Sequence, residues 1–270
     1  MRRGSKEIVR EAFYAAGERN YLLSKLFYTG IFGRRWEVAL VGFAYLKCLD
    51  NAVDEEPDCD KAFAVLASQR ELISREYSGK SSGEDITLLE RYGRFFFRYD
   101  RAHGMWWRPL IETIVGTMEF DVRRRHVAMP RETLDCYFDT LGEAVIRYTA
   151  YFIAPGYPLH HSFIRSASRA YLYADSLIDL EHDLRFGLIN VPAEDIEAWQ
   201  LDVSAPNPRL IDWAAARAPA VLSLFSEALA EAPRLAGLRV RWLAQLFLSR
   251  KRTRLARFLD KRRMSARHGL

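Results

Sequence analysis

The sequence predicts an all-α fold, and three observations support that prediction. Nearly every long segment repeats its apolar residues with the 3.6-residue period of a helix. No run alternates apolar and polar residues in the way that predicts a strand. Segments rich in proline, glycine and serine fall between the periodic stretches, where helix ends are expected. We therefore expect a bundle of helices.

The expected helices follow one another along the chain, and breakers separate most of them. They cover residues 5–30, 34–54, 60–77, 84–101, 105–125, 131–153, 160–185, 209–231 and 233–262. The breakers are Pro57, SGKSSG (78–83), Pro130, PGYP (155–158) and VSAPNP (203–208). A chain of 270 residues with no internal repeat and no long linker predicts a single domain over residues 1–270.

Composition and charge narrow the class of protein. No apolar run approaches the roughly 20 residues that span a bilayer, and the start, MRRGSKEIVREAF, lacks an apolar signal core. We therefore expect a cytoplasmic protein. The net charge of +5 comes largely from residues 250–270, which hold nine Lys or Arg and one Asp. We expect a solvated terminal helix there, with peripheral contact to an anionic membrane as the alternative and no nucleic-acid partner.

Two acidic clusters about 120 residues apart are the most informative feature. Asp50 and Asp54 lie in CLDNAVDEE, and Asp175, Asp179 and Asp183 lie in ADSLIDLEHDL. A spacing of four residues stacks carboxylates along one helix face, roughly 6 Å per step. Because apolar residues surround both clusters, we expect the carboxylates to be shielded from solvent, where they need compensating charge. Oxygen ligands beside a phosphate-bearing substrate favour Mg²⁺.

These carboxylates suggest a specific chemistry if both helices face one pocket. Five carboxylates could hold about two or three Mg²⁺ ions around a diphosphate, so that an allylic C–O bond ionises in a dry cavity lined by aromatic rings. Lys47 and Arg185 lie close enough to the clusters to contact diphosphate oxygens. The alternative for either cluster alone is a structural face of ion pairs.

Four segments resemble motifs of the squalene and phytoene synthases, which join isoprenoid diphosphates on an all-α isoprenoid-synthase fold. FAYLKCLDNAVDEE and YADSLIDLEHDLRFGLINVP are similar to the first and second aspartate motifs of that family. GTMEFDVRRR and YFDTLGEAVIRY resemble the segments between them, so the likeness covers about residues 15–195. It implies a helical bundle with a central active-site cavity. In the second motif Asp179 and Asp183 take the paired aspartate positions, and Asp175 stands where the family often has Asn. We expect all five aspartates to bind Mg²⁺.

The chain departs from that family pattern where a second prenyl chain would lie. Glu143 and Arg147 stand at or beside places where the family keeps glycine and small residues. Ile178, Leu188 and Asn190 replace residues that the resemblance associates with a second diphosphate. The departures indicate that ionisation is kept while the acceptor has changed. The chain resembles a divergent branch of the family that attaches a short prenyl group to a carbazole-type acceptor.

The leading prediction is therefore a Mg²⁺-dependent prenyltransferase of specialised metabolism. It would move a short allylic group, such as dimethylallyl, from its diphosphate to an indole- or carbazole-type acceptor. Glu143 would accept a proton from the acceptor or orient it; the alternative is that an ion pair with Arg147 only shapes the pocket. The expected substrate-binding residues are Lys47, Asn51, Arg147, Arg185, Tyr148 and Tyr171.

Two other interpretations stay open. One is head-to-head condensation of two farnesyl or geranylgeranyl diphosphates, which predicts a long apolar tunnel that Glu143 and Arg147 do not enter. The other is a non-catalytic relative that acts as a binding or assembly factor. Such a relative would be expected to lose metal-binding aspartates, whereas all five positions carry Asp here.

Overall fold

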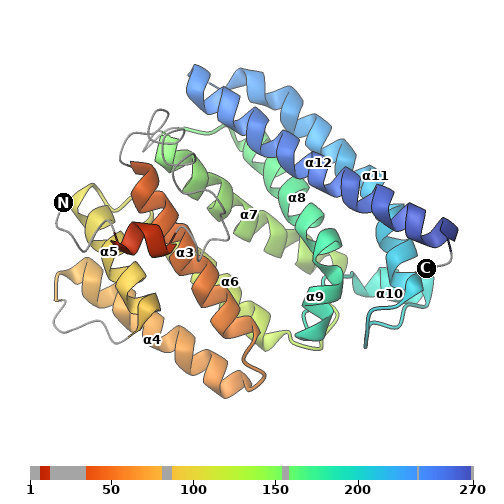
Figure 1. The fold of residues 1–270 in the computed structure, drawn as a ribbon, viewed down its shortest axis with the longest axis horizontal. Helices are drawn as coiled ribbons and strands as arrows, with labels where there is room; N and C mark the ends of the chain where they lie inside the picture. The colour runs from red at the N-terminus through yellow and green to blue at the C-terminus, as the bar shows by residue number, and fades with distance from the viewer. Residues whose placement is uncertain (1–6, 13–34, 81–86, 154–157, 236, 269–270) are drawn as a thin grey trace. The chain divides into compact units, whose positions relative to one another are not determined.

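Figure 1 shows the fold in a computed structural model, which describes residues 7–12, 35–80, 87–153, 158–235 and 237–268. The helices are α3 (Arg35–Asp54), α4 (Cys59–Ser78), α5 (Leu88–Ala102), α6 (Arg108–Arg123), α7 (Arg131–Ile153), α8 (His161–Ile178), α9 (Leu180–Arg185), α10 (Ala193–Trp199), α11 (Pro208–Glu231) and α12 (Leu238–His268). These described ranges contain helices and no strand, so the predicted all-α class is confirmed.

Most expected helices appear within a few residues of their predicted bounds, and the differences have local causes. The expectation of one helix over 160–185 is wrong, because a break at Asp179 separates α8 from α9. Helix α10 was not expected, since it is too short for its period to stand out. Helix α12 begins at Leu238 instead of 233, because a short 3-10 turn containing Pro233 precedes it. Of the expected helix over 5–30, only 7–12 lies within the described residues, and it is helical.

Polar side chains and glycine explain several helix ends. Asp58 precedes α4 and accepts hydrogen bonds from two backbone N–H groups of its first turn. Thr87 and Glu90 form a reciprocal capping box at the start of α5. The side chain of Asn207 accepts a backbone hydrogen bond at the start of α11. Gly79 ends α4 with φ of 77°, a left-handed conformation that favours glycine.

The chain divides into two compact units. Unit 1 comprises Met1–Val122 and Tyr148–Gly156, and unit 2 comprises Arg123–Arg147 and Tyr157–Leu270. Helix α7 contributes residues to both units. The single domain expected over residues 1–270 stays a prediction.

An aromatic core holds unit 1 together. Helix α5 packs against α3 and α4, and its Phe96 and Phe97 are fully buried. The ring of Phe97 meets that of Tyr45 edge to face, with centroids 5.1 Å apart. The ring of Phe96 lies 5.7 Å from that of Trp107. Burial of these large rings provides much of the hydrophobic stabilisation of the unit.

A buried carboxylate closes the connection between α5 and α6. Asp100 is fully buried; it accepts a 2.5 Å hydrogen bond from the hydroxyl of Tyr77 and a 3.2 Å bond from the backbone N–H of Trp107. Burial raises the pKa of this carboxyl, while the hydrogen bonds oppose the rise. Asp100 therefore has a structural role in unit 1.

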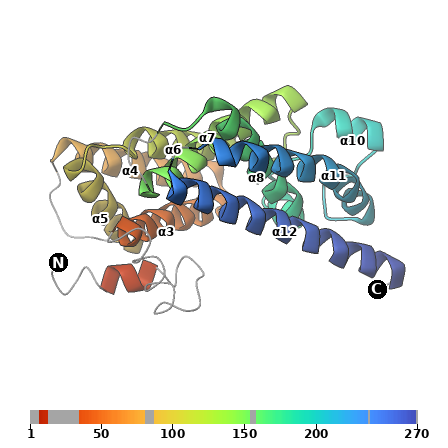
Figure 2. The ribbon, with the colours of Figure 1, turned by 90° about the horizontal axis from the view of Figure 1, so that it is seen from above.

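In unit 2, α8, α11 and α12 pack together. Figures 1 and 2 both show α11 and α12 side by side, and both helices contact α8. The inward face of α12 includes Leu248, Leu255 and Leu259. Lys251 lies on the same buried face, one turn before Leu255. This face brings a positive charge into the interior of unit 2.

Candidate active site

The first acidic cluster lies at the C-terminal end of α3 in unit 1. Leu49 and Val53 point into the core, while Asp50 and Asp54 occupy other positions on the helix. Asp50 is exposed and Asp54 is half-buried. The expected shielding of this cluster is therefore wrong for Asp50, because the neighbouring apolar residues face away from it. Lys47, one turn before Asp50, is also exposed.

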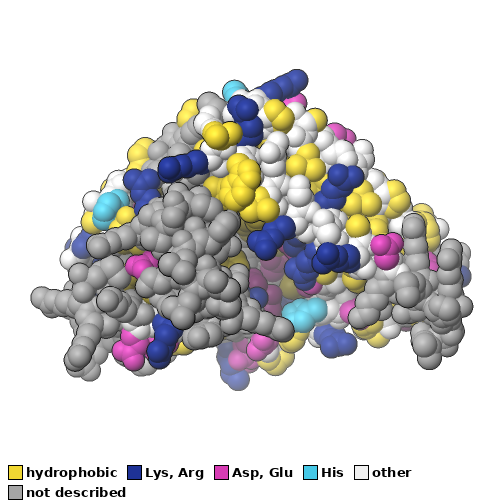
Figure 3. All heavy atoms as spheres, turned by 45° about the horizontal axis from the view of Figure 1, so that its top comes forward, with side chains coloured by type: hydrophobic (Ala, Val, Ile, Leu, Met, Phe, Trp, Pro, Cys, Tyr) yellow, Lys and Arg dark blue, Asp and Glu magenta, His cyan; other side chains and the backbone are white. Residues whose placement is uncertain are grey.

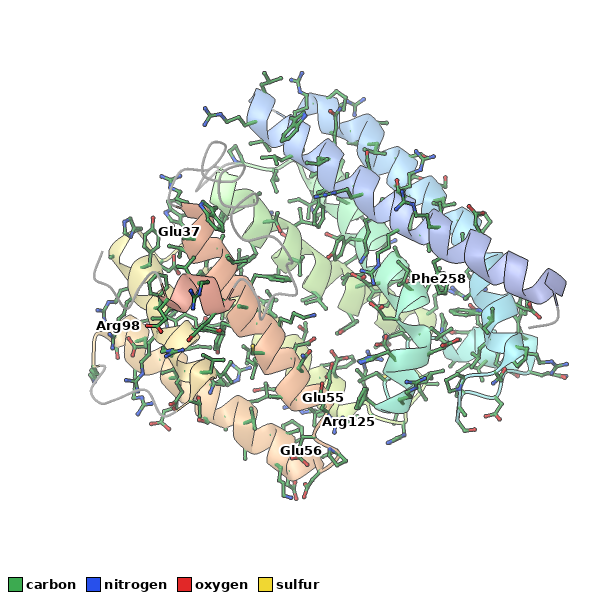
Figure 4. All side chains as sticks on the ribbon, viewed as in Figure 1. Glu37, Glu55, Glu56, Arg98, Arg125 and Phe258 are labelled. Atoms are coloured by element: carbon green, nitrogen blue, oxygen red, sulfur yellow. The ribbon has the colours of Figure 1, made fainter. Side chains whose placement is uncertain are left out.

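The end of α3 concentrates negative charge. Glu55 and Glu56 follow Asp54 directly in the sequence, and Figure 4 labels both near the C-terminal end of α3. The C-terminal end of a helix carries a partial negative charge, and the last turn of α3 contains no basic residue. An acidic side chain at such an end is unfavourable by roughly 0.3–1 kcal/mol. The acidic side chains thus add to the partial negative charge of this helix end. Asn51, a predicted substrate-binding residue, is exposed in the same turn.

The second acidic cluster keeps its register across the break between α8 and α9. The backbone N–H of Asp179 donates to the carbonyl of Asp175 over 2.8 Å, and that of Asp183 donates to the carbonyl of Asp179 over 2.9 Å. These are the i to i+4 bonds of an α-helix. The three aspartates therefore share one face, as their spacing predicted.

Two basic residues of α12 meet this cluster. Lys251 forms an ion pair with Asp175, and a terminal nitrogen of Arg254 lies 3.5 Å from Oδ1 of Asp179. The solvated terminal helix expected from the sequence is thus wrong for Lys251, whose side chain is only 8% exposed. The sequence held one clue, since Lys251 continues the four-residue apolar repeat of Leu255 and Leu259.

The surroundings of Lys251 combine burial, charge and an aromatic face. Its Nζ lies 4.4 Å from the ring centroid of Tyr171, and this ring stacks on Phe247 with centroids 4.9 Å apart. Burial, with a smaller effect from the positive charge of Arg254, lowers the pKa of Lys251 to about 7. The carboxylate of Asp175 acts in the opposite direction, because it favours the ammonium form. Burial also raises the pKa of Tyr171.

Asn190 and Arg124 hold Asp183 in place. The amide nitrogen of Asn190 donates to Asp183 over 2.9 Å, and its amide oxygen accepts a 2.7 Å bond from Arg124. Arg124 is 3% exposed; it also donates to the carbonyl of Ile189 over 3.0 Å and lies 4.9 Å over the ring of Tyr137. Asn190, which the family resemblance marks as a lost contact, therefore positions a site carboxylate.

A tight turn follows the second cluster. Arg185, the last residue of α9, is exposed, and Gly187 adopts φ of 77°. A Cβ atom on Gly187 would lie 2.6 Å from the imidazole of His126. Both the backbone conformation and the close approach require glycine here.

Glu143 and Arg147 form an ion pair on α7 within unit 2. Nε of Arg147 donates to Oε1 of Glu143 over 2.7 Å. The side chain of Arg147 is 28% exposed and that of Glu143 is 41% exposed, so this pair is not buried. The preceding Gly142 packs tightly on α8, since an added Cβ would lie 2.5 Å from Cβ of Ser168. The small residue at 142 thus serves the contact between α7 and α8.

Tyr148 lies in the core of unit 1. It is 5% exposed, and its hydroxyl donates to the backbone carbonyl of Ala39 over 3.3 Å. Its ring centroid is 6.1 Å from that of Phe96, and burial raises its pKa well above the ordinary value. These contacts give Tyr148 a packing role, and its predicted contact with substrate stays a prediction.

The residues of the second cluster differ in how well they fit a magnesium ion. Among the described residues, no group of three or more His, Cys, Asp or Glu is arranged to hold a metal ion. Asp179 and Asp183 nevertheless offer the hard oxygen donors that Mg²⁺ prefers, and their side chains are 43% and 18% exposed. Asp175 fits less well, because one of its oxygens contacts the ammonium group of Lys251.

A small cavity lies beside the second cluster in unit 2. Its volume is about 130 Å³, and Asn190, Tyr173 and Arg131 contribute to its lining. Ligand pockets usually measure roughly 300–1,000 Å³. The lining includes none of the three clustered aspartates, so this cavity is not the predicted substrate site.

Comparison with known proteins identifies the fold. No protein-family model and no curated protein matches the sequence. The structure is similar to the crystal structure of squalene synthase HpnC from Alicyclobacillus acidocaldarius, with a TM-score of 0.68 and 18% identity over 96% of this chain and 95% of that one. It is also similar to a dehydrosqualene synthase in complex with ligand, with a TM-score of 0.58 and 13% identity over 97% and 99% of the two chains. The chain therefore has the all-α isoprenoid-synthase fold of the squalene synthases.

Proposed function

We propose that this chain is a Mg²⁺-dependent enzyme that ionises an allylic diphosphate and transfers its prenyl group to an acceptor. The observation that supports this most is the second acidic cluster, whose three carboxylates stay in helical register. The hydrogen bond from Asn190 orients Asp183. The likeness to squalene synthase over nearly the whole chain supports the same class of reaction.

Carboxylates of both acidic clusters would bind the cations on which the reaction depends. When bound there, Mg²⁺ would neutralise the negative charge of the departing diphosphate. Lys47 and Arg185, both exposed beside the clusters, would donate hydrogen bonds to diphosphate oxygens. The carboxylates proposed to hold the metal are those of Asp50, Asp54, Asp179 and Asp183.

The proposed reaction requires a base, and the ion pair on α7 contains a candidate for it. The allylic C–O bond breaks and the diphosphate leaves with its electron pair; an electron-rich carbon of the acceptor then forms the new C–C bond and loses a proton. Glu143 is the proposed base for that proton. Its hydrogen bond from Arg147 would keep the carboxylate oriented.

Two acceptors follow from two different observations. The charged pair of Glu143 and Arg147 supports a small aromatic acceptor of the indole or carbazole type, which would use a base and would not need a long apolar tunnel. The structural likeness to a squalene synthase and a dehydrosqualene synthase supports a second prenyl diphosphate. The acceptor is therefore the first property to measure.

A product screen by mass spectrometry tests both acceptors. The chain is incubated with Mg²⁺ and dimethylallyl, geranyl, farnesyl or geranylgeranyl diphosphate, each alone and with indoles or carbazoles. A prenylated aromatic product would establish the aromatic acceptor, and a hydrocarbon made from two long diphosphates would establish condensation. The Asp179→Asn variant provides the background. Absence of any product and of diphosphate release would instead favour the non-catalytic interpretation.

The exposed face of α12 supports a weak contact with an anionic membrane. Arg250, Arg252 and Arg257 are exposed, and Figure 3 shows Lys and Arg side chains at several points on the face that it presents. No helix among the described residues is long and apolar enough to cross a bilayer. We expect salt-sensitive co-sedimentation with anionic vesicles and none with neutral ones.

A further inference from the structure

We propose that Lys251 is the cation that neutralises Asp175 in the folded protein. Its ammonium group takes the place of a metal ion at this carboxylate, so that the second acidic cluster binds Mg²⁺ through Asp179 and Asp183 without Asp175. This inference rests on the proposed function and defines the composition of its metal site.

Lys251 is built into the interior of unit 2. Its side chain is 8% exposed, and the neighbouring turn of α12 buries Leu255. A buried ammonium group is costly unless an anion compensates it. Asp175 supplies that anion through the ion pair. Separating the pair would therefore leave a positive charge in apolar surroundings.

The packing of α8 against α12 fixes the position of the pair. Tyr171 precedes Asp175 by one turn, and Phe247 precedes Lys251 by one turn. The rings of Tyr171 and Phe247 stack with an interplanar angle of 10°, and the ammonium group lies 4.4 Å from the centroid of the Tyr171 ring. This stacking sets the register of the two helices so that the ammonium group meets the carboxylate.

A magnesium ion at Asp175 would share one carboxylate with the ammonium group of Lys251, which contacts its Oδ1 atom. Mg²⁺ binds carboxylate oxygens at about 2.0–2.1 Å, so both positive charges would lie within a few ångströms of each other. Their repulsion would drive the lysine out of the helix interface. Lys251 therefore neutralises the charge of Asp175 before any metal ion binds.

Asp179 presents the opposite case. Arg254 lies 3.5 Å from its carboxylate, and the two side chains are 58% and 43% exposed. An exposed guanidinium group can move into solvent or onto a diphosphate oxygen at little cost. Asp179 thus stays accessible to a metal ion.

A thermodynamic cycle of Mn²⁺ binding tests the inference. Mn²⁺ is titrated in the presence of inorganic diphosphate, at mildly acidic pH, into the wild type, Asp175→Asn, Lys251→Met and the double variant. The Asp175→Asn single variant should bind Mn²⁺ with an affinity within about twofold of that of the wild type. Lys251→Met should strengthen binding about tenfold, and adding Asp175→Asn should remove that gain. A tenfold weakening by Asp175→Asn alone would overturn the inference.

Arg254→Met is the matched control, because it removes a positive charge from the same helix one turn later. Asp175→Asn should stay neutral in the Arg254→Met background. The inference is wrong if Arg254→Met also strengthens Mn²⁺ binding and adding Asp175→Asn removes that increase. The increase would then come from any loss of positive charge near the cluster.

Asp179→Asn separates this inference from the proposed function. Two results would contradict both the proposed metal site and this inference. One is that the wild type binds no Mn²⁺ in the presence of diphosphate, and the other is that Asp179→Asn binds Mn²⁺ as well as the wild type. If Asp179→Asn and Asp175→Asn both weaken Mn²⁺ binding, the proposed metal site stands and only this inference is wrong.

Melting temperatures of the metal-free protein test the ion pair itself. Asp175→Asn and Lys251→Met should each lower the melting temperature by several degrees, with non-additive effects in the double variant. Unchanged melting temperatures would show that the pair is not formed.

Discussion

At the end of α3, Asp50 and Asp54 are followed by two more acidic residues, and the last turn contains no basic residue. At the end of α8, the same four-residue spacing meets Lys251 at Asp175 and an amide from Asn190 at the third aspartate. The first cluster ends a helix whose last turn holds no basic residue, whereas the second lies where a lysine of α12 and an amide of the following turn contact it. The same aspartate spacing thus occurs once at a helix end and once at a packed contact between helices.

The largest expected effect tests whether both clusters serve one reaction. Asp50→Ala and Asp179→Ala should each lower turnover by about 10³-fold or more, because each removes a proposed ligand of the metal that stabilises the leaving group. Turnover is measured by mass spectrometry and folding by circular dichroism. Glu55→Gln, which removes a neighbouring negative charge (Figure 4), is the control and should keep activity. Full activity in both alanine variants would exclude the metal assignment.

A second prediction concerns the amide that orients Asp183. Asn190→Ala should weaken Mn²⁺ binding in the presence of diphosphate by about 10–100-fold, because the carboxylate loses its hydrogen-bond donor. Isothermal titration calorimetry measures the change. Asn207→Ala removes another amide of unit 2, one that caps α11, and should leave metal affinity unchanged. Equal affinities in the wild type and Asn190→Ala would show that Asp183 needs no such support.

The stability of the metal-free protein should respond to the second cluster. Asp175→Asn should lower the free energy of unfolding by about 2 kcal/mol, because it leaves the buried ammonium group of Lys251 without its anion. Urea denaturation measures this loss. A stability equal to that of the wild type would mean that the ion pair between Asp175 and Lys251 adds nothing to the stability of the fold.

The first cluster should show a small effect of opposite sign. Glu55→Gln should raise the free energy of unfolding by about 0.3–1 kcal/mol at low ionic strength, because it removes a negative charge from the negative end of α3. The gain should shrink as salt is added. Destabilisation by Glu55→Gln would indicate that the charge of Glu55 is favourable at this position.

Local sequence was sufficient to predict most of the helices and the shared face of each aspartate cluster. Helix period and breakers depend on residues within a few turns, and α7 has the predicted bounds. The break at Asp179 was not predicted, because the surrounding apolar pattern continues through it without proline or glycine. Helix α10 was missed since seven residues hold too few turns to show a period.

The sequence by itself determined the all-α class, the aspartate spacing and the excess of basic residues in α12, because these follow from composition and local periodicity. Only the tertiary structure decided which cation each carboxylate meets. Lys251 lies 76 residues from Asp175, and their contact depends on how α12 packs on α8. The link from Arg124 through Asn190 to Asp183 likewise depends on a turn that brings together residues 66 positions apart. Charges buried by such packing depend on partners distant in the chain, which a local pattern does not specify.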